Sequence, residues 1–139
     1  MAMRVPMTGG CACGAVRYEC SAEPLASLHC HCRDCQHETG SAFASVIVVP
    51  TVAFRLTRGQ PKVFGVKADS GATTNRAFCG ECGSPLFGNP ERRPEMRTVR
   101  VGSLDDPSPF RPTHDIFTDS AQPWDHMDPS RRKFPRLPD

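Results

Sequence analysis

The 139-residue chain contains no apolar run near the roughly 20 residues that a membrane-spanning helix needs. Residues 1–7 also lack the apolar core of a secretory signal, which favours a cytoplasmic location. Helical periodicity is scarce, and the formal net charge is only +2. We therefore expect one small domain over residues 1–139 that does not associate with membranes.

Short strand patterns dominate the chain. They occupy residues 15–20, 41–49, 52–57, 62–66, 73–78, 96–101 and 113–117, and glycine, proline or aspartate separates them. This spacing is typical of an all-β domain with short strands and at most one short helix. The helix is expected over residues 33–39, with Gly40 in the position after its end. Seven prolines after residue 105 predict an extended proline-rich C-terminal segment over residues 105–139, laid on the surface.

Cysteine is the residue type that needs an explanation. The chain has eight cysteines and no sign of export, so metal ligands are expected rather than structural disulfides. The pairs Cys11-Ala-Cys13 and Cys30-His-Cys32 are also too closely spaced to make good disulfides, yet each suits chelation of one ion.

The first metal centre combines two pairs. Cys79-Gly-Glu-Cys82 followed by Gly83 forms a knuckle that aims two sulfurs at one point. A knuckle cannot complete a tetrahedral site alone, and Cys11 with Cys13 is the natural second pair. Four thiolates give a closed zinc site of the structural type, called the first centre below.

The remaining cluster, Cys30, Cys32 and Cys35, is called the second centre. Three thiolates leave one coordination position for water, a substrate or a further protein ligand, a pattern typical of catalytic zinc. The alternative is a second structural site that Cys20 or a histidine completes. With either interpretation we expect two zinc ions per chain.

Several further residues near these motifs receive expected roles. Cys20 ends a strand pattern and is expected to be a buried free thiol. His29 and His31 flank the second-centre ligands, where either would line the open position or donate a hydrogen bond to a ligand. His37 is expected to face solvent on the short helix.

Three cysteine motifs, in residues 10–18, 30–35 and 78–86, closely resemble the glutathione-dependent formaldehyde-activating enzyme family, whose domain also occurs in centromere-protein-V-like proteins. Residues 40–43, 101–107, 114–117 and Trp124 are also similar to that family. The resemblance implies one β-tent zinc domain of that family. It places a structural zinc on Cys11, Cys13, Cys79 and Cys82, and a functional zinc on Cys30, Cys32 and Cys35.

The resemblance also implies carbon–sulfur lyase chemistry, in which formaldehyde is joined to glutathione or released from the adduct. The partner is then a small thiol or aldehyde, with glutathione as co-substrate. His31 and Ser41 are candidates for relaying a proton. Arg17, Arg33 and Arg76 are candidates for pairing with the carboxylates of a glutathione-like substrate. The sequence is also compatible with a homodimer.

Two rival functions fit parts of the sequence. A zinc module without turnover would bind protein or nucleic acid through the basic residues 131–133, but three charges make a small basic face. Seven thiolates and two zinc ions also change the formal charge from +2 to about −1. A methionine sulfoxide reductase of type B needs a reactive cysteine late in the chain, yet none follows Cys82, which leaves only Cys20.

Overall fold

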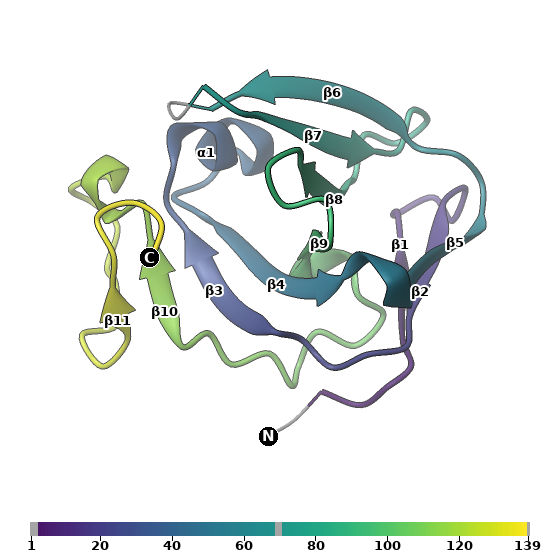
Figure 1. The fold of residues 1–139 in the computed structure, drawn as a ribbon, viewed down its shortest axis with the longest axis horizontal. Helices are drawn as coiled ribbons and strands as arrows, with labels where there is room; N and C mark the ends of the chain where they lie inside the picture. Colours follow the sequence, from purple (N-terminus) through teal and green to yellow (C-terminus); the bar gives the residue numbers. More distant parts are fainter. Residues whose placement is uncertain (1–2, 69–70, 139) are drawn as a thin grey trace.

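The computed structural model describes residues 3–68 and 71–138 (Figure 1). Over these ranges the chain forms eleven strands, one α-helix and three short 3-10 turns. The strands are β1 (Met7–Gly10), β2 (Arg17–Cys20), β3 (Ala26–Cys30), β4 (Ala44–Pro50), β5 (Phe54–Arg58), β6 (Lys62–Lys67), β7 (Thr73–Phe78), β8 (Pro85–Pro90), β9 (Met96–Arg100), β10 (His114–Ile116) and β11 (Arg132–Lys133). The helix is α1 (Arg33–Thr39), and the 3-10 turns are η1 (Thr51–Ala53), η2 (Val101–Ser103) and η3 (Thr118–Ser120). The all-β prediction with one short helix is confirmed, and no helix in these ranges is long and apolar enough to span a membrane.

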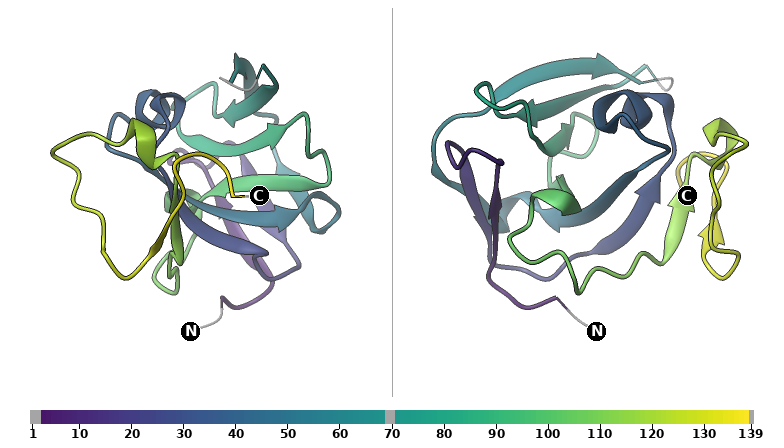
Figure 2. Two further views of the ribbon diagram at one scale, coloured as in Figure 1. Left: turned by 60° about the vertical axis from the view of Figure 1, so that its left-hand side comes forward. Right: turned by 180° about the vertical axis from the view of Figure 1, so that it is seen from behind.

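The strands form two sheets. The smaller is antiparallel with the order β1-β2-β5, and the larger has the order β11-β10-β3-β4-β9-β8-β7-β6. In the larger sheet only β10 pairs in parallel, with β3 on one side and β11 on the other. The larger sheet curls, with α1 beside β7, and the smaller sheet lies across the molecule from β10 and β11 (Figures 1 and 2).

Strand β4 separates two apolar clusters. Ile47 and Val49 face the larger cluster, which lies between the two sheets, whereas Ala44 and Val46 face a smaller one under α1 and β10. Successive side chains of a strand point to opposite faces, so a strand covered on both faces is apolar almost throughout. This explains the continuous run of β-branched residues in this part of the sequence.

Tyr18 joins the smaller sheet to the turn that follows β9. Its ring stacks on Phe54 with centroids 4.9 Å apart, and its hydroxyl lies 2.6 Å from Ser103 Oγ. A Cβ atom at Gly9 would lie 2.5 Å from the Tyr18 hydroxyl and from the Ser103 carbonyl oxygen. Close approach of these groups therefore requires glycine at position 9.

The predicted elements appear with shifted ends, and four strands were not predicted. Helix α1 spans the predicted residues, and Gly40 follows it with a φ of 68°. β1 and β8 were not predicted because glycine or proline makes up half of each strand. β3 was not predicted because it continues directly into a cysteine motif, and β11 because it has only two residues. In the proline-rich segment, β10 and β11 join the larger sheet.

Candidate metal centres

The four sulfurs of the first centre lie within 4.8 Å of one another. Cys13 Sγ lies 3.6 Å from Cys11 Sγ and 3.7 Å from Cys79 Sγ. A tetrahedral zinc with Zn–S bonds of about 2.3 Å places its sulfurs about 3.8 Å apart. The donor set and its spacing therefore fit a zinc ion held by Cys11, Cys13, Cys79 and Cys82.

Two similar turns shape the first centre. Gly14 follows Cys13 in the β1–β2 turn, Gly83 follows Cys82 in the β7–β8 turn, and both glycines have a φ of 79°. The Val16 amide donates to Cys11 Sγ at 3.2 Å, which stabilises that sulfur as a thiolate. Since one turn belongs to each sheet, a metal here would fasten the two sheets together.

Hydrogen bonds also favour the thiolate form of Cys82. The Ser84 hydroxyl lies 3.2 Å from Cys82 Sγ. Hydrogen bonds from the side chain and backbone of Ser84 lower the pKa of Cys82 to about 5. Because a metal ion binds the deprotonated form of cysteine, the contact with Ser84 favours the form of Cys82 that can act as a ligand.

The second centre forms where β3 passes into α1. Cys30 ends β3, Cys32 caps the helix, and Cys35 lies in its first turn; their sulfurs lie within 4.8 Å of one another. The Cys35 amide donates to Cys32 Sγ at 3.3 Å. Within residues 3–68 and 71–138, no ligand atom of a fourth cysteine, histidine, aspartate or glutamate joins this group. The second centre therefore offers an ion three thiolates and an incomplete coordination sphere.

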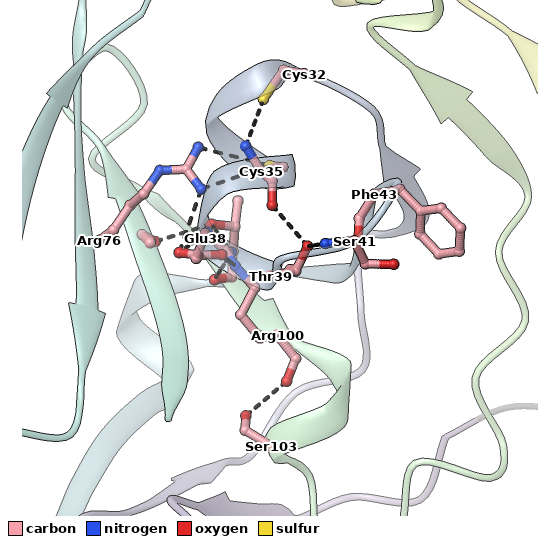
Figure 3. Close-up of polar contacts among 11 residues, drawn as sticks. Cys32, Cys35, Glu38, Thr39, Ser41, Phe43, Arg76, Arg100 and Ser103 are labelled. Carbon is pink, nitrogen blue, oxygen red and sulfur yellow. Dashed lines mark hydrogen bonds and ion pairs between the residues drawn. The ribbon is translucent and has the colours of Figure 1, made fainter. Parts of the chain in front are cut away.

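Arg76 of β7 lies against the second centre (Figure 3). Its two terminal nitrogens lie 3.6 and 3.7 Å from Cys35 Sγ, and Nη1 lies 3.4 Å from Glu38 Oε2. Glu38 also forms an ion pair with Arg100 of β9. Hydrogen bonds from Cys30 and Cys32, together with the positive charge of Arg76, lower the pKa of Cys35. The expectation that Arg76 pairs with a substrate carboxylate stays a prediction, because here its partners belong to the chain.

His31 points into a buried ionic network rather than toward an open surface. Its Nε2 lies 2.9 Å from Asp115 Oδ1, and its Nδ1 lies 2.7 Å from Asp125 Oδ2, a close contact without hydrogen-bond alignment. Asp115 also contacts Arg131 Nε at 3.1 Å and Lys133 Nζ at 3.0 Å. Burial opposes ionisation of Asp115, but hydrogen bonds from these groups lower its pKa to about 2. The network anchors the C-terminal segment to the loop that carries the second centre.

The other predicted residues are distributed around these centres. His29 stacks on Phe43 with centroids 4.0 Å apart, and burial lowers the pKa of His29 to about 4, which favours the neutral ring. Cys20 is buried in the core between the sheets, as expected, and its Sγ contacts the Ala22 carbonyl oxygen. His37 is exposed, also as expected.

Ser41 and two arginines lie at the surface. Ser41 is exposed, whereas its proposed relay partner His31 is fully buried. Arg33 donates to Gln36, and Arg17 donates to both carboxylate oxygens of Asp105. Sequence reasoning missed Glu38, Arg100, Asp115 and Asp125 as members of the charged networks, since a lone charged residue in a short element carries no periodic signal.

Two pockets flank α1. The central pocket, of about 660 Å³, lies between the first centre and the C-terminal turn of α1; its lining includes Arg17, Glu38, Phe43, Arg100, Gly102 and Asp105. The helix pocket, of about 380 Å³, is lined by residues that include Arg33, Gln36, His37, Ser41, Gln122 and Trp124. Both volumes lie in the range of small-molecule sites.

Comparison with known proteins gives a consistent result. The family model of the glutathione-dependent formaldehyde-activating enzyme matches residues 6–120. A protein of Emericella nidulans, provisionally named a glutathione-dependent formaldehyde-activating enzyme, is 35% identical over 58% of this chain and 40% of its own. A Penicillium rubens protein with the same name is 34% identical over 63% of this chain and 49% of its own. The matches thus span less than half the length of these curated relatives. The crystal structure of a Rhodobacter sphaeroides protein is similar with a TM-score of 0.58 and 25% identity, covering 71% of this chain and 88% of that one.

Proposed function

The chain belongs to the glutathione-dependent formaldehyde-activating enzyme family, and from this premise we propose that it forms or cleaves a thiol–aldehyde adduct at the second centre. The substrates would be a thiol such as glutathione and an aldehyde such as formaldehyde. The observation that carries the proposal is the contrast between four converging sulfurs at the first centre and three at the second. A cytoplasmic setting suits the reaction because thiols stay reduced there.

The reaction balances without an oxidant or reductant. In adduct formation, the thiol sulfur bonds to the carbonyl carbon, the carbonyl π electrons move to oxygen, and the thiol proton ends on that oxygen. In the reverse direction the same carbon–sulfur bond breaks. Zinc bound by Cys30, Cys32 and Cys35 would lower the pKa of a thiol at its fourth position or polarise the aldehyde oxygen.

Arg76 would balance charge during this reaction. Three thiolates give a zinc site a net charge of about −1, and an incoming thiolate adds a further negative charge. The Arg76 guanidinium already lies against Cys35 Sγ, in a part of the molecule where water screens it poorly. It would stabilise the thiolate-bound state more than the free site.

We assign His31 a positioning role in place of the proton relay expected with Ser41. Asp115 and Asp125 engage both ring nitrogens of His31, whereas Ser41 is exposed. A fixed ring at position 31 holds the backbone between two ligands, Cys30 and Cys32. His31 would thereby keep these sulfurs at chelating distance without contacting the substrate.

The rival function as a nucleic-acid module loses its supporting feature. Arg131 and Lys133 both contact the buried Asp115 carboxylate, and the Arg132 guanidinium lies over the Phe134 ring. These partners leave no free cluster of three cations for phosphates. The interpretation as a small-molecule enzyme therefore accounts for more of the structure.

Exchange spectroscopy tests the proposal. Thiols also add to formaldehyde without a catalyst, so ¹³C exchange between free formaldehyde and its glutathione adduct is measured with and without the zinc-loaded protein. We expect faster exchange with the wild type and none above background with Cys32→Ser. Cys20→Ser, which changes a buried thiol outside both centres, is the matched control. Equal acceleration by Cys32→Ser would contradict the proposal.

A further inference from the structure

The helix pocket lies on the face of α1 that points away from the second centre. Arg33, Gln36 and His37 line it at spacings of three and four residues, which place their side chains on one side of a helix. Cys35 instead contacts Arg76 of β7. The lining contains no ligand residue of either centre, so this pocket is separate from the proposed reaction site.

Gln36 joins α1 to the C-terminal segment in the wall of this pocket. The residue is buried, and its Nε2 donates to the carbonyl oxygens of His31 at 2.7 Å and Ser120 at 3.0 Å. Its Oε1 accepts from Arg33 Nη1 at 2.6 Å and from Gln122 Nε2 at 2.9 Å. These four contacts use both donors and both lone pairs of the amide. The two chain segments that form the pocket are therefore held together before any ligand binds.

Arg33 brings a positive charge that no carboxylate on the lining neutralises. Its guanidinium donates to Gln36, and Nη2 lies 3.4 Å from His37 Nε2. These contacts use at most two of its five N–H donors. Among the residues that the structure describes, Arg33 forms no ion pair. In the central pocket, by contrast, both arginines pair with carboxylates on the same lining. Of the two pockets, the helix pocket is therefore the one that offers an unpaired cation to an anion.

Trp124 adds an aromatic face to the same lining. It is the only tryptophan of the chain, and its side chain is 63% exposed although it lies on the pocket. Within residues 3–68 and 71–138, no other ring stacks on the indole. An exposed indole gains from covering by a second ring, which also removes apolar surface from water. The volume of about 380 Å³ is near the lower end for small-molecule sites and suits a ligand with one ring.

We infer that the helix pocket binds a small aromatic monocarboxylate, with the carboxylate on Arg33 and the ring against Trp124. A planar carboxylate matches the fork of a guanidinium group, and one unpaired arginine balances one negative charge. The ligand would bridge α1 and the C-terminal segment. This inference does not rest on the proposed function, because neither cysteine centre contributes to the lining.

Titration of the zinc-loaded protein with benzoate tests the inference. Because the chain has one tryptophan, ¹⁵N-labelled protein gives one indole N–H resonance, which reports directly on the pocket. We expect this resonance to move with a dissociation constant on the order of 1 mM, since the lining is largely exposed. Cyclohexanecarboxylate has the charge without the aromatic face, and benzyl alcohol has the ring without the charge. Each should bind at least about threefold more weakly than benzoate.

Four variants separate the two contacts. Arg33→Gln removes the cation and should weaken benzoate binding at least about fivefold. Arg55→Gln is the matched control, because Arg55 is also exposed but pairs with Glu19 outside the pocket, and it should change the affinity less than about twofold. Trp124→Leu should weaken binding at least about threefold, whereas Trp124→Phe keeps a ring and should stay within about twofold of the wild type. The Gly40 amide on the lining replaces the indole as the reporter in the last two variants.

Three results would overturn the inference. The first is an indole resonance that does not move with benzoate. The second is equal affinity for benzoate and benzyl alcohol, which would leave no role for the cation. The third is equal weakening by Arg33→Gln and Arg55→Gln, which would show that benzoate responds only to net charge. Zinc content and the melting temperature verify that each variant is folded, and the comparison of the three ligands needs the wild type alone.

Discussion

The guanidinium of Arg76 contacts the sulfur of Cys35 through both terminal nitrogens, at 3.6 and 3.7 Å. Arg76 belongs to β7, which ends next to Cys79, whereas Cys35 belongs to α1. The strand that leads to the first centre therefore also supplies the positive charge beside the second. This arrangement links the two cysteine motifs through one strand.

Arg76→Gln should weaken zinc binding at the second centre about tenfold, because a charge-assisted contact contributes on the order of 1.5 kcal/mol. The loss follows from the negative charge of a three-thiolate zinc site, which Arg76 partly neutralises. Competition with a chromophoric chelator measures the affinity of each site. Arg97→Gln is the control, since that arginine packs on Phe54 and Phe87 instead. An unchanged second-site affinity in Arg76→Gln would refute this role.

Asp115→Asn should destabilise the protein by about 2–4 kcal/mol. Breaking a fully buried ion pair costs roughly 3–5 kcal/mol, and the cost here is lower because Lys133 is one-third exposed. Urea unfolding at neutral pH measures the change. Asp106→Asn, which alters an exposed carboxylate that accepts hydrogen bonds from Ser108, should cost less than about 1 kcal/mol. Equal losses in the two variants would show that the network does not anchor the C-terminal segment.

Gly9→Ala should destabilise the fold by about 1–3 kcal/mol, because its methyl group would overlap the Tyr18 hydroxyl and the Ser103 carbonyl oxygen. Gly102→Ala meets no heavy atom within 4 Å and should change stability by less than about 0.5 kcal/mol. Thermal unfolding of the two variants provides the comparison. A harmless Gly9→Ala would mean that the smaller sheet does not approach η2 this closely.

The protein should show no salt-dependent binding to duplex DNA or to single-stranded RNA. Arg131 and Lys133 already neutralise Asp115, and releasing them would leave a buried carboxylate unpaired. Fluorescence anisotropy with labelled oligonucleotides at low and moderate salt measures the affinity. Micromolar binding that weakens steeply with salt would favour the interaction-module alternative.

Cysteine spacing made the two centres predictable from the sequence. Close pairs such as Cys11 and Cys13 have few geometric options, so their grouping with the Cys79 knuckle could be inferred from the ligand number alone. Strand alternation similarly predicted β2 and β5, and a continuous run of β-branched residues predicted β4. Patterns of neighbouring residues thus sufficed to predict the cysteine groups and these strands, because the geometry of both is set by residues close in sequence.

The charged networks could not be predicted in this way. Asp115 and His31 are 84 residues apart and meet only because β10 pairs in parallel with β3. Arg76 approaches Glu38 only because the larger sheet curls and so brings β7 next to α1 (Figure 1). Such contacts depend on strand order, which alternation does not encode. The sequence made Arg76 a candidate partner of a substrate carboxylate and made residues 131–133 the basic face of the rival interaction module. In the structure Arg76, Arg131 and Lys133 contact acidic groups of the chain itself.

The central claim is that four sulfurs complete the first centre while three leave the second incomplete. Counting zinc per folded chain in the wild type, Cys32→Ser and Cys82→Ser tests it most directly, with circular dichroism to verify folding. We expect about two ions in the wild type and about one in a folded Cys32→Ser, whereas Cys82→Ser should unfold because its site joins the sheets. A Cys32→Ser protein that unfolds as completely as Cys82→Ser, or that retains two ions, would contradict the account.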